Sequence, residues 1–129
     1  MTELFEGKTL KDYISERGKL FEAEAMNIFR KILIGCNAIT QACIIHRDLK
    51  PSNILINSTQ DPIIIDFGFC EIICAKKVMK AFNVGSPSYM SPEAFLKTLY
   101  SEKSDSWSLG MVLYEMVQGR TMDDGLDIR

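Results

Sequence analysis

The chain has 129 residues, the size of one ordinary domain, and it is long enough to bury a hydrophobic core. Apolar residues make up 47% of the sequence and charged residues 25%, a mixture that is typical of a globular protein and excludes a disordered one. The formal net charge of -2 gives no reason to expect nucleic acid or an anionic membrane as a partner.

The cysteines and the apolar runs predict an intracellular protein, either cytoplasmic or nuclear. The four cysteines show neither paired CxxC spacing nor the density of a disulfide-stabilised small domain, so we expect reduced thiols. The first residues, MTELFEGK, contain acidic side chains and lack the apolar core of a signal peptide. Because no apolar run approaches roughly 18 residues, we expect no membrane span.

Two helices are predicted in the first forty residues. The segment 9–16 (TLKDYISE) has Thr9 as an N-cap, and Gly18 follows just beyond its end. Apolar residues then recur at helical spacing over 21–40, with charged residues on the other faces, which predicts a long helix. Pro51 prevents a helix from running through the polar segment that follows.

Two short runs of β-branched and other apolar residues predict an antiparallel hairpin. ILI at 54–56 and III at 63–65 flank the turn-forming residues NSTQDP. The expected register pairs the first residue of one run with the last residue of the other, which places Asn53 opposite Asp66. The hairpin then presents both side chains at the same end.

The second half of the chain is predicted to contain loops and one buried helix. Residues 69–84 show no clean periodicity, and we expect a loop with one helical turn at most. GSPSYMSPEAF, at 85–95, is rich in turn formers and runs into a short helix. Residues 105–118 (DSWSLGMVLYEMVQ) are apolar on almost every side, which predicts a helix buried in the core.

The segment HRDLKPSNILI, at 46–56, concentrates polar side chains beside an apolar run and contains the single histidine. At one end of the hairpin, Asn53 and Asp66 would offer the hard oxygen ligands that hold Mg2+ beside substrate phosphates. Asp48 is close enough in sequence to accept a proton there, and Lys50 can neutralise a phosphate. For each residue alone, an ordinary polar loop is the alternative interpretation.

Four motifs in order carry a resemblance. HRDLKPSN is followed, thirteen residues after Asn53, by DFG at 66–68, and then by GSPSYMSPE and SDSWSLG. In this order and at this spacing they resemble the catalytic domain of protein kinases of the Ser/Thr type. The resemblance extends from Glu3 to about Gly119. It implies an α+β, mainly α fold, the C-terminal lobe of a protein kinase with a small antiparallel hairpin at the catalytic loop.

The resemblance implies a role for each reactive residue. Asp48 corresponds to the aspartate that accepts the substrate hydroxyl proton, and Asn53 and Asp66 correspond to the two magnesium ligands. Lys50 corresponds to the lysine beside the transferred phosphoryl group. The Lys-Pro dipeptide, and Ser86 at the position that contacts the catalytic aspartate, imply serine or threonine as the acceptor. ATP and Mg2+ are the implied cofactors, and a protein is the implied substrate.

Other matched residues are expected to support the site. His46 and Phe67 resemble two of the stacked residues that align the kinase lobes, and Gly68 completes the DFG motif. Asp105 resembles the residue that anchors the catalytic-loop backbone. Glu93 matches an acid whose arginine partner lies much later in the family.

The first residues resemble the segment that joins the two kinase lobes. Thr2 would then lie at the back of the adenine pocket, the backbone of Glu3 and Phe5 would bind the adenine edge, and Leu55 would lie beneath the ring. We therefore expect 1–129 to be a partial protein kinase domain, from the inter-lobe segment through the buried helix after the activation segment. The N-terminal lobe and the last helices are expected to be absent.

Arg47 precedes the catalytic aspartate, and in the family such an arginine commonly pairs with a phosphorylated residue of the activation loop. Residues 69–85 contain no Ser, Thr or Tyr. We expect this loop not to be switched by phosphorylation.

Two functions follow from the resemblance. The first is a protein serine/threonine kinase, represented by an incomplete chain, which transfers the ATP γ-phosphoryl group to protein hydroxyls; the presence of Asp48, Asn53 and Asp66 favours it. The alternative is a non-catalytic truncated kinase fragment that acts as a binding module or decoy. A small-molecule phosphotransferase is a third interpretation, which the peptide-positioning GSPSYMSPE stretch disfavours. A protein that covers the surface left by the missing lobe is a candidate partner.

Overall fold

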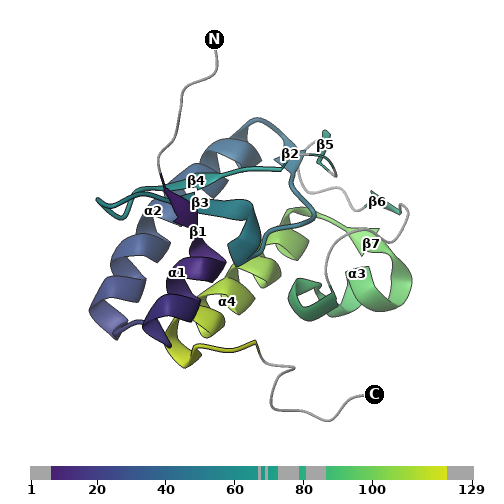
Figure 1. The fold of residues 1–129 in the computed structure, drawn as a ribbon. Coiled ribbons are helices and arrows are strands. Elements are labelled where there is room, and N and C mark those ends of the chain that lie inside the picture. The colour runs from purple at the N-terminus through teal and green to yellow at the C-terminus, as the bar shows by residue number, and fades with distance from the viewer. Residues whose placement is uncertain (1–6, 67, 69, 73–78, 81–86, 122–129) are drawn as a thin grey trace.

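Helices form most of the described structure, and a small antiparallel sheet lies against them (Figure 1). This mainly α arrangement with a small sheet confirms the predicted fold class. A computed structural model describes residues 7–66, 68, 70–72, 79–80 and 87–121. The longer helices are α1 (Leu10–Arg17), α2 (Glu22–Gln41) and α4 (Glu102–Gln118), and the short helix α3 covers Pro92–Lys97.

The first two helices form close to where the sequence predicts them. The Thr9 hydroxyl oxygen accepts a hydrogen bond of 3.1 Å from the backbone N–H of Asp12, which is the expected N-cap of α1. Gly18 follows α1 at φ 80°, a backbone conformation that favours glycine. α2 lies one residue later at each end than predicted.

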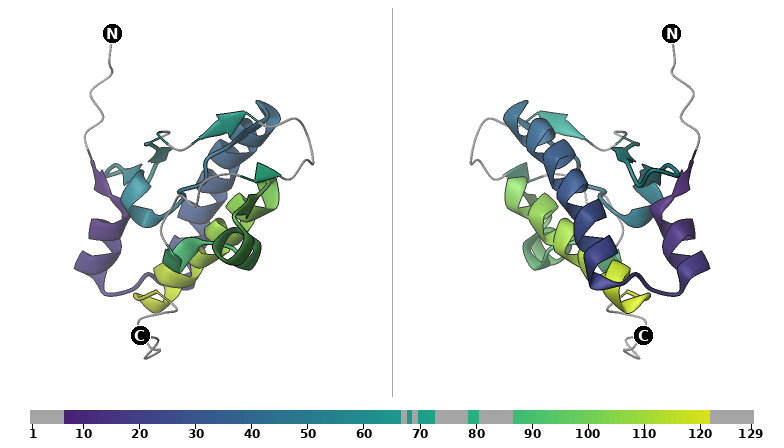
Figure 2. Two further views of the ribbon diagram at one scale, coloured as in Figure 1. Left: turned by 90° about the vertical axis from the view of Figure 1, so that its right-hand side faces the viewer. Right: turned by 90° about the vertical axis from the view of Figure 1, so that its left-hand side faces the viewer.

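The core lies where α1, α2, α4 and the β3–β4 hairpin meet, and α2 and α4 cross each other in both side views (Figure 2). On α2 the buried positions recur every three or four residues, which produces one apolar stripe along the helix. The buried core residues are Leu10, Ile14, Leu20, Ala25, Ile28, Ile32, Cys36, Leu49, Ile54, Ile56, Tyr89, Leu109, Val112 and Met116.

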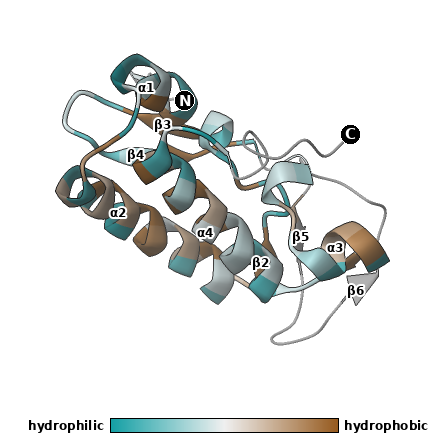
Figure 3. Cartoon of the chain, turned by 90° about the horizontal axis from the view of Figure 1, so that it is seen from below, coloured by the Kyte–Doolittle hydropathy of each residue, from teal (hydrophilic) through white to brown (hydrophobic). Residues whose placement is uncertain are grey.

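Helix α4 differs from the prediction in its start and in its burial. It begins at Glu102, because Ser101 and Ser104 form a capping box in which each side chain binds the other residue's backbone N–H. Only one side of α4 is buried, and Trp107 is 46% exposed. α4 thus contributes to the core as predicted, but not all of its apolar residues are buried. Figure 3 shows apolar residues also on the exposed side of α3, where Phe95 and Leu96 lie.

The end of α4 approaches the α1–α2 connection closely. The backbone N–H of Leu20 donates to the Met116 carbonyl at 2.8 Å. Gly119 ends α4 at φ 77°, and a Cβ atom there would lie 1.9 Å from the Gly18 carbonyl oxygen. Glycine is thus required at position 119 both by its backbone conformation and by this contact.

Cys36 reports on the packing of α2. Burial, with a smaller contribution from the charge of Asp105, raises the pKa of the Cys36 thiol to about 12. Since the thiolate is the reactive form, we expect iodoacetamide at pH 8 to alkylate Cys36 at least about a hundredfold more slowly in the folded protein than in urea. Peptide mass spectrometry measures this rate, and equal alkylation with and without urea would contradict the packing described for α2.

The three-stranded sheet has the order β1–β3–β4, all antiparallel: β1 is Lys8–Thr9, β3 is Ile54–Ile56 and β4 is Pro62–Ile64. The hairpin is confirmed but its predicted register is wrong by one residue. Ile54 pairs with Ile64 and not with Ile65, and Ile56 pairs with Pro62.

The turn explains the register. The side-chain oxygen of Asn57 accepts hydrogen bonds from the backbone N–H groups of Thr59 and Asp61, at 3.1 and 2.9 Å. Gln60 adopts a φ of 62°. The loop therefore closes between Asn57 and Asp61, which makes Pro62 the first residue of β4, although the sequence analysis assigned this proline to the turn.

Two further short ladders involve residues that were predicted to be a loop. β2 (Ile44–Ile45) pairs with β5 (Glu71–Ile72), and β6 (Met79–Lys80) pairs with β7 (Leu99–Tyr100), both antiparallel. The expectation that 69–84 forms no strand is wrong at these positions, because strand pairs of two residues are too short to produce a periodic pattern. Among the described helices, none is long and apolar enough to cross a membrane.

Candidate active site

The polar segment 46–53 follows β2 as a loop and ends in a 3-10 helix, η1 (Pro51–Asn53). Pro51 begins η1, where its fixed φ suits the first helical position and its missing N–H is not needed. His46 links the loop to α4 through its backbone N–H and to the residue after β4 through its ring.

His46 connects this loop to the end of β4. It is fully buried, its Nδ1 accepts a hydrogen bond from the backbone N–H of Asp48 at 3.2 Å, and its Nε2 lies 2.9 Å from the Ile65 carbonyl oxygen. Since Nδ1 accepts, Nε2 carries the hydrogen and donates to that carbonyl. Both ring nitrogens are thus engaged in holding the backbone, an arrangement that supports a packing role and leaves no nitrogen for proton transfer.

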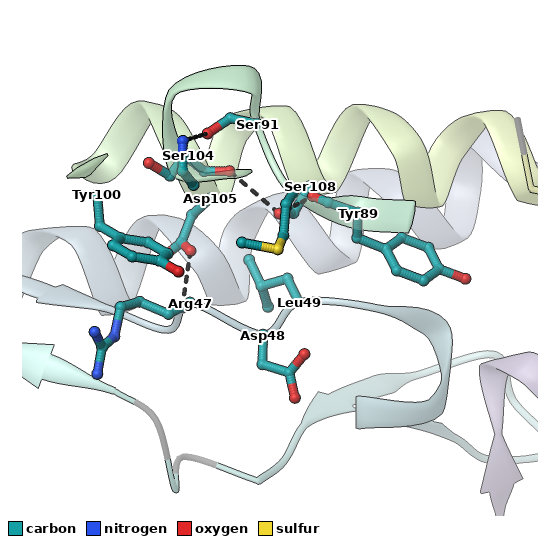
Figure 4. A pocket seen from close by; sticks show the side chains of 11 residues that line it. Arg47, Asp48, Leu49, Tyr89, Ser91, Tyr100, Ser104, Asp105 and Ser108 are labelled. Carbon is teal, nitrogen blue, oxygen red and sulfur yellow. Dashed lines mark hydrogen bonds between the residues drawn. The ribbon is translucent and has the colours of Figure 1, made fainter. Parts of the chain in front are cut away.

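Asp105, in the first turn of α4, holds the backbone of the loop. Its two carboxylate oxygens accept hydrogen bonds from the backbone N–H groups of His46, at 2.7 Å, and Arg47, at 3.1 Å (Figure 4). Burial raises the pKa of the Asp105 carboxyl, while these two hydrogen bonds lower it and offset part of the rise.

Asp48, Lys50 and Asn53, which the sequence predicts to be reactive, lie together in the loop. The side-chain Nδ2 of Asn53 donates to the Asp48 backbone oxygen at 2.7 Å and to its carboxylate Oδ2 at 3.2 Å. Asp48 and Asn53 are only 7% and 5% exposed, so the pair is rigidly placed. The Lys50 ammonium lies 3.8 Å from the other Asp48 oxygen. In Figure 4 the Asp48 carboxylate points away from α4.

Asp66 lies at the same end of the hairpin as Asn53, but it is not directly opposite Asn53 as predicted. The Ile65 N–H donates to the Asn53 carbonyl at 2.9 Å, so Ile65, not Asp66, stands opposite Asn53. Asp66 is exposed, has a φ of 60°, and accepts a 3.4 Å hydrogen bond from the Gly68 N–H. A non-glycine residue in the left-handed region is strained by about 1–3 kcal/mol, and such residues concentrate at functional sites.

The donor set suits a magnesium ion. Because Asn53 directs its Nδ2 at Asp48, its side-chain oxygen is the atom that can bind a metal ion, and the exposed residue Asp66 adds a carboxylate. Among the described residues, no three acidic, histidine or cysteine side chains gather into a metal cage. Mg2+ is typically held by one or two protein oxygens together with water and substrate phosphates, so two ligands fit this ion.

The remaining predicted site residues are spread over the chain. Leu55 is half-buried in β3, between Thr9 of β1 and Ile63 of β4. Glu93 is half-buried in the first turn of α3. The predicted residues Thr2, Glu3, Phe5, Phe67 and Ser86 lie outside the described residues.

A pocket behind the loop contains residues that the sequence analysis missed. It is formed by the catalytic loop, the segment leading into α3, and α4 (Figure 4). Ser108 donates to the Tyr89 carbonyl at 2.6 Å, and the Tyr89 hydroxyl binds the buried Glu115 carboxylate. Two polar residues on the buried side of an otherwise apolar helix were the signal that could have identified this contact.

The loop contains an aspartate, a lysine and an asparagine, which are residue types that protein kinases use in phosphoryl transfer. A model of the protein kinase domain family matches residues 1–125. The chain belongs to the protein kinase domain family.

Curated proteins with similar sequences agree with this family. Mitogen-activated protein kinase kinase 1 of Arabidopsis thaliana is 42% identical over 119 residues, which cover 92% of this chain and 34% of that protein. Serine/threonine-protein kinase PrkC of Bacillus subtilis is 40% identical over 124 residues, covering 95% of this chain and 19% of that protein. The carbon catabolite-derepressing protein kinase of Candida tropicalis is 40% identical over 117 residues, covering 90% of this chain and 19% of that protein. The chain thus spans between a fifth and a third of the length of these relatives.

Proposed function

We propose that this chain carries the catalytic-loop part of a protein serine/threonine kinase, which transfers the γ-phosphoryl group of ATP to serine or threonine hydroxyls of a protein. The observation that carries the proposal is the constellation of Asp48, Lys50 and Asn53, in which one asparagine nitrogen fixes the Asp48 carboxylate while Lys50 lies beside it.

Each residue has a chemical task in this proposal. Asp48 accepts the proton of the substrate hydroxyl, because a carboxylate oxygen can take up a proton and Asn53 holds this side chain in place. Lys50 places a positive charge next to Asp48, where it offsets the charge of the transferred group. Asn53 and Asp66 hold Mg2+, which neutralises phosphate charge when it is bound.

The choice of serine or threonine as acceptor is supported by sequence and by similarity. The dipeptide Lys50-Pro51 stands where tyrosine kinases usually carry a different sequence, and Pro51 is buried at the start of η1. PrkC, one of the similar proteins, is by name a serine/threonine-protein kinase. Ser86 is proposed to contact Asp48 from the activation segment.

The test uses the full-length natural protein that contains this chain, a degenerate peptide library with Ser, Thr and Tyr acceptors, and MgATP. We expect phosphoserine and phosphothreonine and no phosphotyrosine in the products. Asp66→Asn removes a charged metal ligand and is expected to lower activity more than about a hundredfold and to raise the Mg2+ concentration needed for half-maximal activity.

Asp61→Asn is the matched control, because Asp61 is an exposed aspartate in the turn of the same hairpin, where it pairs with Lys31 at 2.8 Å. Its activity and Mg2+ dependence should remain those of the wild type. Equal activity of the Asp66 and Asp61 variants would contradict the metal-binding role. If the wild-type protein transferred no phosphate, the proposed kinase activity would be excluded and a role as a binding module would be favoured.

A further inference from the structure

We propose that Tyr100 is a positioning residue for Asp48, and that its ring holds Arg47 in the way that a phosphorylated activation-loop residue holds such an arginine elsewhere. The inference rests on the proposed kinase function. It names a side chain that none of the four motifs contains, and it assigns to this site a form of regulation: activity without phosphorylation of the loop.

The contact itself is a cation–π interaction. The guanidinium carbon of Arg47 lies 5.3 Å from the centroid of the Tyr100 ring, and Figure 4 shows the two side chains together at one side of the pocket. Tyr100 is 2% exposed. Because the ring is shielded from water, its attraction for the cation is stronger than at an exposed site.

The backbone of Arg47 transmits this contact to Asp48. Arg47 has a φ of 70°, an unfavourable conformation for a residue with a side chain, and it directly precedes Asp48. Its N–H donates to the Asp105 carboxylate at 3.1 Å, and its guanidinium lies over Tyr100. Loss of the ring would remove the aromatic contact that restrains the side chain next to this strained backbone.

Tyr100 also belongs to the ladder that includes part of the activation segment. In the β6–β7 pair, Met79 stands opposite Tyr100, so the backbone of Tyr100 contacts the segment while its ring contacts the catalytic loop. Residues 69–85 contain no Ser, Thr or Tyr and therefore cannot carry a phosphorylated hydroxyl. A buried aromatic ring is permanently present, so it holds Arg47 without a modifying enzyme.

The experiment is a double-mutant cycle in the full-length protein after phosphatase treatment, with intact mass used to verify that no phosphate remains. Tyr100→Leu removes the ring, Tyr100→Phe keeps it, and Arg47→Met removes the charge but keeps the stem. We expect Tyr100→Leu to lower kcat about tenfold with little change in KM for ATP, and Tyr100→Phe to retain kcat within about threefold. The kcat of the double variant should be no lower than that of the less active single variant, since each of the three variants removes the same contact.

Tyr13→Leu is the matched control. Tyr13 also lies under an arginine, with the Arg17 guanidinium carbon 4.9 Å from its ring centroid, but its hydroxyl contacts Glu24 and Gln60 and neither Arg47 nor Asp48. This variant should lower the melting temperature and leave kcat unchanged. Wild-type activity that falls more than about tenfold on dephosphorylation, or losses at Arg47 and Tyr100 that multiply, would overturn the proposal.

A readout independent of activity separates this inference from the proposed function. Hydrogen–deuterium exchange of the Arg47 and Asp48 amides should be at least about threefold faster in Tyr100→Leu than in the wild type or Tyr100→Phe, under conditions where all variants are folded. If the protein transfers no phosphate, the kinase proposal fails while this exchange still tests the positioning contact. Unchanged exchange in Tyr100→Leu would disprove the contact, whatever the activity.

Discussion

Asp48→Asn is expected to lower kcat of the full-length protein by about a thousandfold, because an amide cannot accept the proton of the substrate hydroxyl. The fold should be retained. Asn53 donates to the Asp48 backbone oxygen as well as to its carboxylate, and an asparagine at position 48 keeps one side-chain oxygen that can accept the second of these hydrogen bonds. KM for ATP should change little, since the proposed metal ligands Asn53 and Asp66 are both retained, although Lys50 loses the negative charge beside it.

Steady-state kinetics measures this effect with MgATP and an unphosphorylated peptide that the library experiment identifies as a substrate. Thermal unfolding verifies the fold. Asp12→Asn, in the first turn of α1, is the control for the loss of one negative charge elsewhere. If Asp48→Asn retained kcat within about threefold of the wild type, the proton-accepting role of Asp48 would be wrong. If both kcat and the melting temperature fell strongly, a structural role would account for the result.

Asp105→Ala is expected to decrease the free energy of unfolding by about 3 kcal/mol. The change leaves the backbone N–H groups of His46 and Arg47 without their acceptor, and each unsatisfied buried donor costs about 1–3 kcal/mol. Urea denaturation measures the loss as a lower midpoint at an unchanged slope. Activity should fall as well, because the strained Arg47 backbone before Asp48 loses its restraint.

Asp12→Ala provides the matched comparison for stability, because Asp12 and Asp105 both lie in the first turn of a helix and share the interaction with the helix dipole. Its loss should be about 0.5 kcal/mol. Equal destabilisation by the two alanine variants would show that the hydrogen bonds to the loop contribute nothing measurable.

The contribution of Asp105 to the free energy of unfolding depends on pH in a defined direction. Burial raises the pKa of Asp105 in the folded protein, so the folded state binds this proton more tightly than the unfolded state does. The stability that Asp105 contributes relative to Asp105→Asn is therefore largest below the ordinary pKa of an aspartate. It decreases as the pH rises through the raised pKa of the folded state.

Local sequence patterns predicted the elements whose causes are local. Thr9 caps α1 and Gly18 follows it, because a cap and a left-handed residue act within one helical turn. The apolar stripe of α2 follows from its 3.6-residue repeat. The start of α4 was missed because the capping pair Ser101–Ser104 precedes the apolar run that was used to place the helix.

The register of the hairpin could not be derived from its apolar runs. Both runs contain three similar residues, so a shift by one residue leaves the hydrophobic pattern almost unchanged, and the turn decides between the registers. The side chain of Asn57 closes the loop at Asp61, and Asp66 consequently lies one residue past Asn53's partner.

The sequence by itself determined the family and predicted the chemical groups of the site, because HRDLKPSN and DFG place these groups at short distances along the chain. Only the tertiary structure decided how that loop is held. Asp105 lies 59 and 58 residues from His46 and Arg47, whose N–H groups donate to it, and Tyr100 reaches Arg47 from strand β7. Contacts between segments so far apart depend on how the helices and short ladders pack, and no local pattern of residues records that packing.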